Sequence, residues 1–116
     1  MTVDLPRLAV NKKLILTNDA MLLVQLALND NPTVEERQEL EEDLSDLEMT
    51  KAELVARRNA INSGQTGGIA APSQAAIDAV SALIAKVEQA NLEGRTVAAR
   101  MALANQAMTT LLTLTA

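Results

Sequence analysis

Residues 39–54 read ELEEDLSDLEMTKAEL, a stretch that is mostly charged and still carries Leu40, Leu47 and Leu54 at intervals of seven. Ile61 extends the row by a further seven residues. Because seven residues make almost two helical turns, these side chains share one face of a helix. The spacing therefore predicts a solvated helix with one narrow apolar row.

The second row that a coiled coil needs is mostly polar. In a heptad with Leu40 at position d, position a holds Arg37, Leu44, Lys51 and Arg58. A strong two-stranded coiled coil has apolar residues at both positions, so this seam is half formed. The long aliphatic stems of the basic residues cover apolar surface while their charged ends stay in water. We therefore expect this helix to contact one partner helix rather than to occupy the centre of a bundle.

A turn and a capping motif predict where this helix begins. The run Asn29-Asp30-Asn31-Pro32 favours a turn, because its residues are poor at continuing a helix. Immediately after it, Thr33 and Glu36 have the spacing of a capping box, in which each side chain accepts a hydrogen bond from the backbone amide of the other residue. These signals predict an acidic helix over 33–62, followed by a Gly-rich linker over 63–72.

The N-terminal segment, 4–29, has a helical pattern with an interruption. Its predicted apolar stripe is broken by two charged residues, Lys12 and Asp19, and consists of Leu5, Leu8, Ile15, Leu22 and Leu26. Asn18 is also a good N-cap for a separate helix, which leaves residues 13–17 free to be extended. We expect helix on both sides of Asn18, with an extended 13–17 as the alternative.

The C-terminal segment, 73–116, predicts one long Ala/Leu-rich helix. Steps of three and four residues connect its apolar stripe, which is Ile77, Val80, Leu83, Ile84, Val87, Ala90, Val97, Met101, Ala104, Met108, Leu111 and Leu112. Gly94 lies on this stripe and weakens the helix, and we expect a continuous or bent helix there rather than a break. Leu and Thr alternate in 112–115 as in a strand, but helix is expected for the tail as well.

The composition indicates an all-α fold. The chain has no Phe, Tyr or Trp, so its core consists of aliphatic residues and Met, which suit close packing of helices. We expect residues 1–116 to form a single helical domain, either a long helical hairpin or a three-helix or four-helix bundle with coiled-coil-like packing. Segments 33–62 and 73–116 are expected to pair antiparallel, with the N-terminal segment alongside.

The residue types exclude most catalytic sites. The chain has no His and no Cys, which removes the commonest general base, the usual nucleophile pairs and the usual transition-metal ligands. Glu35, Glu39, Glu42 and Asp46 share a face and are suited to a hard cation, although a solvated acidic face is the favoured interpretation. We therefore expect no catalytic residues, no cofactor and no metal, and hence no enzyme.

Charge and hydropathy narrow the partners. The net charge of −5 argues against nucleic acid, whose phosphates need clustered Lys and Arg. No apolar run reaches the roughly 20 residues of a transmembrane helix, and no Sec-type signal peptide is visible at the N-terminus. We expect a cytoplasmic protein, or one within a macromolecular assembly, for which a membrane partner is unlikely on these grounds.

The length of the C-terminal helix suggests a binding role. Since 73–116 is longer than 33–62, part of its stripe is expected to stay uncovered and to bind a partner or a second copy. The predicted partner-binding residues are Val97, Met101, Ala104, Met108, Leu111 and Leu112. Methionine repacks easily in binding grooves, although ordinary packing is the favoured role of Met101 and Met108.

The sequence therefore predicts a non-enzymatic interaction or assembly subunit. It would act through self-association or by docking a partner protein, as a small adaptor, a chaperone or a structural component of a phage or secretion-type assembly. The alternative is a helical protein that binds lipid or another hydrophobic surface, although such helices usually carry basic and aromatic residues.

Overall fold

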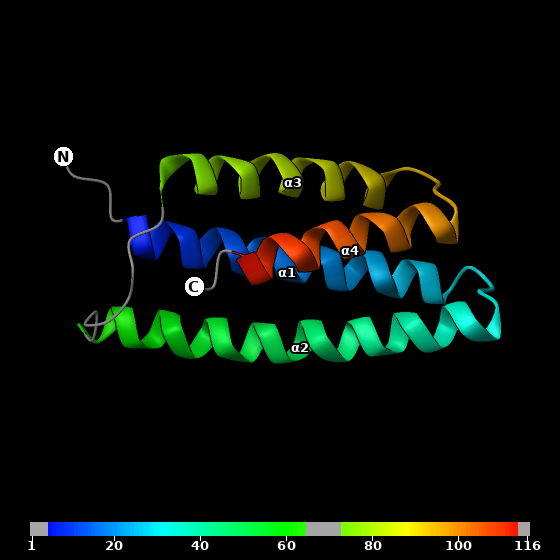
Figure 1. Ribbon diagram of the computed structural model, residues 1–116, viewed down its shortest axis with the longest axis horizontal. Helices are drawn as coiled ribbons and strands as arrows, with labels where there is room; N and C mark the ends of the chain where they lie inside the picture. The colour runs from blue at the N-terminus through cyan, green and yellow to red at the C-terminus, as the bar shows by residue number, and fades with distance from the viewer. Residues whose placement is uncertain (1–4, 65–72, 114–116) are drawn as a thin grey trace.

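The computed structural model describes residues 5–64 and 73–113, which form an elongated bundle measuring 47 × 23 × 19 Å (Figure 1). The described residues contain four helices: α1 (Leu5–Leu28), α2 (Val34–Asn62), α3 (Gln74–Leu92) and α4 (Val97–Thr113). They contain no strand. The predicted all-α bundle is confirmed, in its four-helix form. Most of the predicted linker, 65–72, and residues 114–116 of the predicted C-terminal helix lie outside the described residues.

Helix α1 runs without interruption through Asn18. The hydroxyl of Thr17 donates a hydrogen bond of 2.7 Å to the carbonyl of Lys13, one turn earlier in the helix. Asn18 is exposed to solvent and starts no new helix. The alternative of an extended 13–17 is therefore wrong, because the polar Thr17 side chain is satisfied inside the helix rather than at its end.

Helix α2 begins and ends at the predicted positions. The Glu36 amide donates to the Thr33 hydroxyl at 3.1 Å, and the Thr33 amide donates to the Glu36 carboxylate at 2.9 Å. At the other end, the backbone amide of Gly64 donates to Ile61. Gly64 has a φ of 81°, a conformation that favours glycine and ends the helix. The capping box is confirmed, and both ends of α2 are set by local hydrogen bonds.

The expected continuous helix over 73–116 is wrong. The backbone of Glu93 is extended, and the helical path stops there. Thr96 starts α4, since its hydroxyl accepts from the Ala99 amide at 3.1 Å as an N-cap does. Nothing lies within 4 Å of the position that a Cβ on Gly94 would take, so the glycine does not serve a close helix contact. A cap at Thr96, rather than packing at Gly94, accounts for the break.

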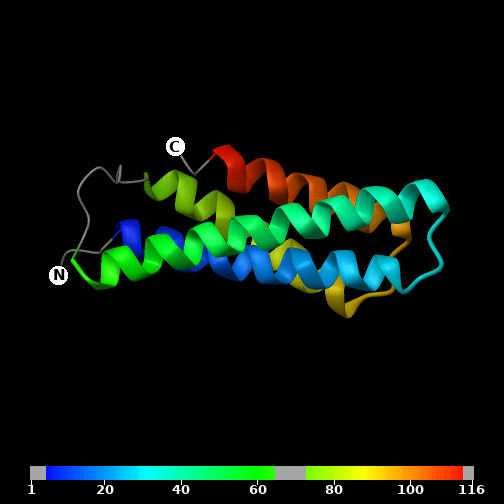
Figure 2. The ribbon, with the colours of Figure 1, turned by 90° about the horizontal axis from the view of Figure 1, so that it is seen from below.

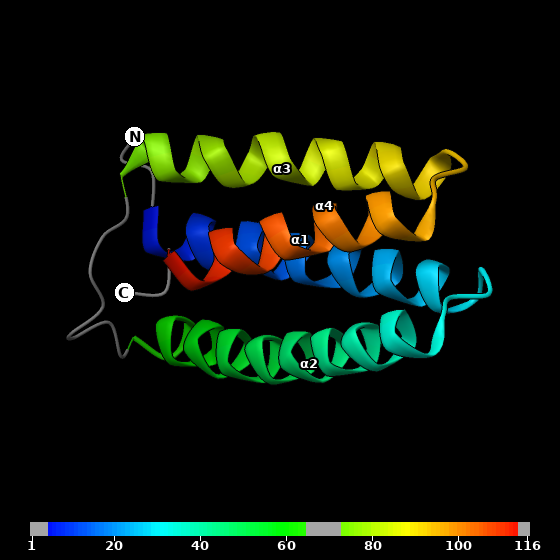
Figure 3. The ribbon, with the colours of Figure 1, turned by 45° about the vertical axis from the view of Figure 1, so that its right-hand side comes forward.

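Helix α1 makes the most extensive contacts with the other helices of the bundle. It packs against α2, α3 and α4, whereas among the described residues no Cα atom of α2 lies within 8 Å of one in α3. Figures 1 and 3 show α1 lying between α2 and α3, and in the view of Figure 2 α4 runs along the upper edge of the bundle with α1 below it. The expected antiparallel pairing of 33–62 with 73–116 is therefore wrong, since in the described part of the chain α1 is the main partner of α2, α3 does not meet it, and α4 meets it only along a short stretch. Since α2 ends and α3 begins on opposite sides of α1, their connection must be longer than a tight hairpin.

Two buried rows explain how α1 packs against α2, α3 and α4. One row contains Ala9, Lys13, Leu16, Ala20, Leu23 and Ala27, and the adjacent row contains Val10, Leu14, Thr17 and Val24. Each row follows heptad spacing, and the alanines permit close approach of neighbouring helices. The predicted stripe of larger residues is not the buried one: Ile15 and Leu22 are 43% and 45% exposed. Following only large side chains misidentified the face, because alanine and threonine supply four of the ten residues in these buried rows.

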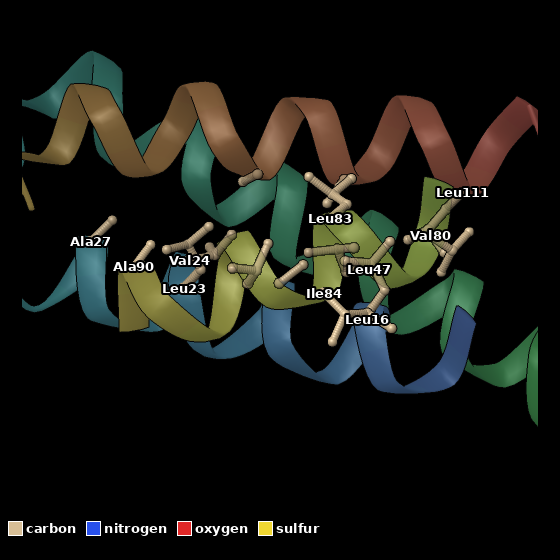
Figure 4. Close-up of a cluster of buried hydrophobic side chains, with 14 of the residues drawn as sticks. Leu16, Leu23, Val24, Ala27, Leu47, Val80, Leu83, Ile84, Ala90 and Leu111 are labelled. Atoms are coloured by element: carbon tan, nitrogen blue, oxygen red, sulfur yellow. The ribbon is translucent and has the colours of Figure 1, made fainter. Parts of the chain in front are cut away.

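The main core joins side chains from all four helices. Leu16, Leu47, Val80 and Leu111 come from α1, α2, α3 and α4 in turn, and all are buried (Figure 4). A smaller cluster near the other end joins α1 and α2 and contains Val10, Leu14, Leu54 and Ile61. The row Leu40, Leu47, Leu54 and Ile61 is at most 3% exposed. The apolar row of the acidic helix is confirmed as the contact face of α2.

Candidate functional site

Folding of α4 back along the bundle places most of the predicted partner-binding residues in the core. Ala104 and Leu111 are buried, and Val97, Met101 and Met108 are half-buried and packed against the core. The side chain of Leu112 lies outside the described residues. The premise that the stripe is left uncovered is wrong, since it assumed one uninterrupted helix. Binding of a partner by these residues stays a prediction, and only an opening beside them is accessible to one.

That opening is a groove between α2 and α4, with a volume of about 220 Å³. Seven residues line it: Asp46, Leu47, Met49, Thr50 and Glu53 from α2, and Met108 and Leu111 from α4. Met49 is 63% exposed although it is a large apolar residue. The groove exists because α2 and α4 meet only along a short stretch. Two predicted residues, Met108 and Leu111, thus line this groove.

The rim of this groove is acidic. Asp46 and Glu53 line it and are exposed to solvent. They belong to a helix that carries most of the acidic residues of a chain with net charge −5. An apolar floor with a negative rim attracts segments that combine apolar and basic side chains. The charge of the rim is thus complementary to basic groups.

A second groove, of about 470 Å³, lies between α3 and α4. Small and neutral polar side chains dominate its lining, which is Ala79, Ala82, Leu83, Lys86, Ala102, Asn105, Gln106, Thr109 and Thr110. Among the described residues that line it, Lys86 is the one charged residue and none is a carboxylate. This groove offers no pair of groups for acid–base chemistry, and we assign it no ligand.

One buried carboxyl group interrupts the apolar face of α2. Asp43 is 9% exposed, and its Oδ2 atom is buried without a hydrogen-bond partner among the described residues. Burial raises the pKa of Asp43, and the negative charges of Glu39, Asp46 and Glu42 raise it further. All these neighbours lie on the same helix. The arrangement opposes ionisation of Asp43 and weakens the α1–α2 contact at neutral pH.

A second carboxyl group with a raised pKa, that of Asp19, lies at the junction of α1 and α3. Burial and the neighbouring carboxylate of Glu88 raise the pKa of Asp19 to about 6. The Oδ2 atom of Asp19 is buried and accepts no hydrogen bond among the described residues. The nearby Asn91 side chain donates to the backbone carbonyl of Asp19 at 3.2 Å instead. Two carboxyl groups therefore face each other here without a cation between them in the described part of the chain.

One buried cation lies on the inner side of α1. Lys13 is 3% exposed, and burial lowers its pKa to about 8, assisted by the positive charge of Arg57. Lys13 comes from one of the two buried rows of α1, where the other members are apolar. It lies away from the groove between α2 and α4 and takes no part in that opening.

The proposed cation face is open to water. Glu35, Glu39, Glu42 and Asp46 are all exposed along α2. Across residues 5–64 and 73–113, no three acidic side chains are arranged to hold a metal ion. Within the same ranges, none of the helices combines the length and the apolar character that crossing a membrane demands.

Comparison with protein-family models, with curated proteins and with solved structures finds no match to this chain. The functional interpretation therefore rests on the residues and their geometry.

Sequence reasoning missed two features that bear on binding. It did not place Met49 opposite Met108, because the pairing of α2 with α4 depends on the break at 93–96. It also assigned Leu8, Ile15 and Leu22 to the core, although the signal of small buried residues in α1 indicates that they face outward.

Proposed function

We propose that this protein is a non-enzymatic interaction subunit that docks a partner protein in the groove between α2 and α4. The observation that supports the proposal best is the exposed Met49 side chain beside the half-buried Met108. Flexible thioether side chains repack around different apolar groups, which suits a docking groove better than a rigid pocket. Leu47 and Leu111 form the buried base on which an apolar side chain would rest.

The partner we propose is a segment with one or two apolar anchors flanked by Lys or Arg. Asp46 and Glu53 on the rim supply the complementary charge. A groove of about 220 Å³ has room for one or two large side chains and not for a folded domain. An amphipathic helix or short peptide would therefore bind with modest affinity, with the anchors supplying most of the energy.

The absence of catalysis is part of the same proposal. The full chain lacks His and Cys, and the carboxylates that line the α2–α4 groove, Asp46 and Glu53, are solvated at its rim. Binding is thus the activity that these residue types serve best.

Selection from a random peptide library tests the proposal. Immobilised protein is expected to enrich peptides with a Leu, Ile, Met or Phe anchor next to basic residues. The Met49→Glu variant should lose these peptides, because a charged side chain would then stand at the mouth of the groove. Leu92→Glu is the matched control, since Leu92 is 89% exposed and lies outside the groove. Enrichment of acidic peptides, no enrichment, or equal binding by Met49→Glu would contradict the proposal.

A further inference from the structure

Helix α1 carries an apolar row on its outer face that the other described helices leave partly exposed. Leu8, Ile15 and Leu22 recur at intervals of seven, so they share one side of the helix. Ile15 and Leu22 are 43% and 45% exposed, and Leu8 is half-buried. The two buried rows, through which α1 packs on the other helices, lie on the opposite side of α1. Single exposed apolar residues are common, but a row in heptad register is a helix-pairing pattern.

The row is symmetric about Ile15. Leu8 and Leu22 lie seven residues to either side, and Leu5 and Leu26 lie ten and eleven residues to either side. A twofold axis beside Ile15 therefore places Leu8 of one copy opposite Leu22 of another, with the two helices antiparallel. Self-complementary placement of this kind is what an isologous twofold interface requires.

The charges beside the row have the same symmetry with opposite sign. Lys12 lies three residues before Ile15, and Asp19 lies four residues after it. An antiparallel copy therefore brings its Lys12 next to Asp19 and the adjacent Glu88 of the first copy. Among the described residues no ion pair joins either carboxylate to a cation, and Glu88 is exposed and therefore open to a second copy. The second copy supplies the cation that this carboxyl pair lacks.

We propose that two copies of this chain associate through the outer face of α1, antiparallel, with Ile15 at the twofold axis and Lys12 of each copy against Asp19 and Glu88 of the other. This interface lies on a different surface from the α2–α4 groove and does not depend on it. One helix face is small compared with the roughly 800 Å² per partner of a standard interface, so the dimer is transient and forms with rising concentration.

Sedimentation equilibrium over a concentration series gives the first test. The apparent mass of the wild type is expected to rise from 12.4 kDa towards twice that value. Ile15→Glu should remain a monomer, and the exposed position of Ile15 makes unfolding by this change unexpected. Lys12→Glu should raise the dissociation constant about tenfold, because like charges then meet across the interface. A wild type that stays monomeric throughout would overturn the proposal.

Single cysteines then test the antiparallel register, since the chain contains no Cys. With a short thiol-specific cross-linker, Ile15→Cys should link to itself. Leu8→Cys alone and Leu22→Cys alone should not, because the antiparallel arrangement separates identical positions by about 21 Å along the axis. An equal mixture of these two variants should link. Linking of Leu8→Cys to itself would indicate parallel helices, and linking only through Met49→Cys would place the contact elsewhere; either result would overturn the proposal.

The outcome is separable from that of the proposed function. Ile15→Glu is expected to keep its binding of basic peptides in the α2–α4 groove, because Ile15 does not line that groove. Loss of dimerisation with intact peptide binding would therefore support both proposals. A monomer that binds peptides would overturn only the dimer, and a dimer that binds none would overturn only the groove.

Discussion

Replacing Asp43 with Asn is expected to stabilise the protein at neutral pH. Asp43 is 9% exposed and interrupts the face through which α2 packs on α1. Its Oδ2 atom has no hydrogen-bond partner among the described residues, and its charged neighbours Glu39, Asp46 and Glu42 are all negative. Asn has nearly the same shape and no charge, so the substitution removes the electrostatic penalty with little change in packing.

The size of the effect follows from the burial of an unpaired group. Leaving a buried polar group unsatisfied costs roughly 1–3 kcal/mol, and the Asn amide still needs partners, so we expect a gain of about 1 kcal/mol at about pH 7. With a urea m-value of about 1–2 kcal/mol per molar for a domain of this size, the unfolding midpoint should rise by about 0.5–1 M.

The pH dependence of stability is a second test of whether Asp43→Asn stabilises the protein. Burial and like charges raise the pKa of Asp43 in the folded state above its unfolded value of 3.8. The folded state therefore binds the proton more tightly, and the Asp43 contribution to stability is greatest below pH 3.8 and lost as the pH rises through the folded pKa. The advantage of Asp43→Asn should accordingly be present at neutral pH and vanish near pH 3.

Urea unfolding followed by circular dichroism measures both effects. Asp46→Asn is the matched control, because Asp46 is exposed on the same helix and its substitution also removes one negative charge. The control should change the free energy of unfolding by less than about 0.5 kcal/mol. If Asp43→Asn destabilised the protein at neutral pH, or if the control gained as much, the inferred penalty at Asp43 would be refuted.

Three further predictions concern stability. The stability of the wild type should fall between about pH 4 and pH 6, because burial and Glu88 raise the pKa of Asp19 to about 6, and Asp19→Asn should flatten this fall. The full pKa shift corresponds to at most about 3 kcal/mol, which solvent screening at this half-buried site reduces to about 1 kcal/mol. Urea unfolding at a series of pH values measures the difference. Thr33→Ala should remove about 1 kcal/mol by opening the capping box, and an unchanged urea midpoint, with Ser45→Ala as the exposed mid-helix control, would contradict this. Leu47→Ala should lower the unfolding free energy by about 2–5 kcal/mol, since Leu47 is 1% exposed. Met49→Ala, two residues away, should have little effect because Met49 is exposed. Similar thermal midpoints for the two variants would argue against the assigned contact face of α2.

Features set by neighbouring residues were the ones that the sequence predicted well. Thr33 and Glu36 place the start of α2 because a capping box is complete within four residues. The row from Leu40 to Ile61 identified the contact face because heptad spacing is a property of one helix. Both predictions needed no knowledge of the partner helix.

Features set by other helices were the ones that the sequence did not determine. The α2 row indicates a contact face but not its partner, and α1 rather than α3 or α4 fills that place. The core rows of α1 contain Ala20 and Thr17, which a search for large apolar residues overlooks. Thr96 was a usable capping signal for the start of α4, and weighing it against Gly94 would have predicted the break.

The groove followed only once the break was known. Met108 and Leu111 were singled out as binding residues from the stripe alone, but their neighbour across the groove, Met49, lies about 60 residues away in the chain and meets them through the fold of α4. Likewise, the outward direction of Ile15 depends on α1 having buried its opposite side. Both candidate surfaces are consequences of tertiary packing rather than of local pattern.

The fold-back of α4 along α3 determines which apolar surface the chain covers and which it leaves open. Ala79 and Thr109 are exposed and line the same α3–α4 groove. Because the chain contains no Cys, cysteines introduced at these two positions can each be labelled with a nitroxide spin label without other sites reacting. Pulsed electron paramagnetic resonance should give a distance below about 25 Å, as expected for labels on adjacent helices. A distance near 45 Å, the length of about 30 residues of unbroken helix, would contradict the hairpin and with it both proposed surfaces of the four-helix bundle.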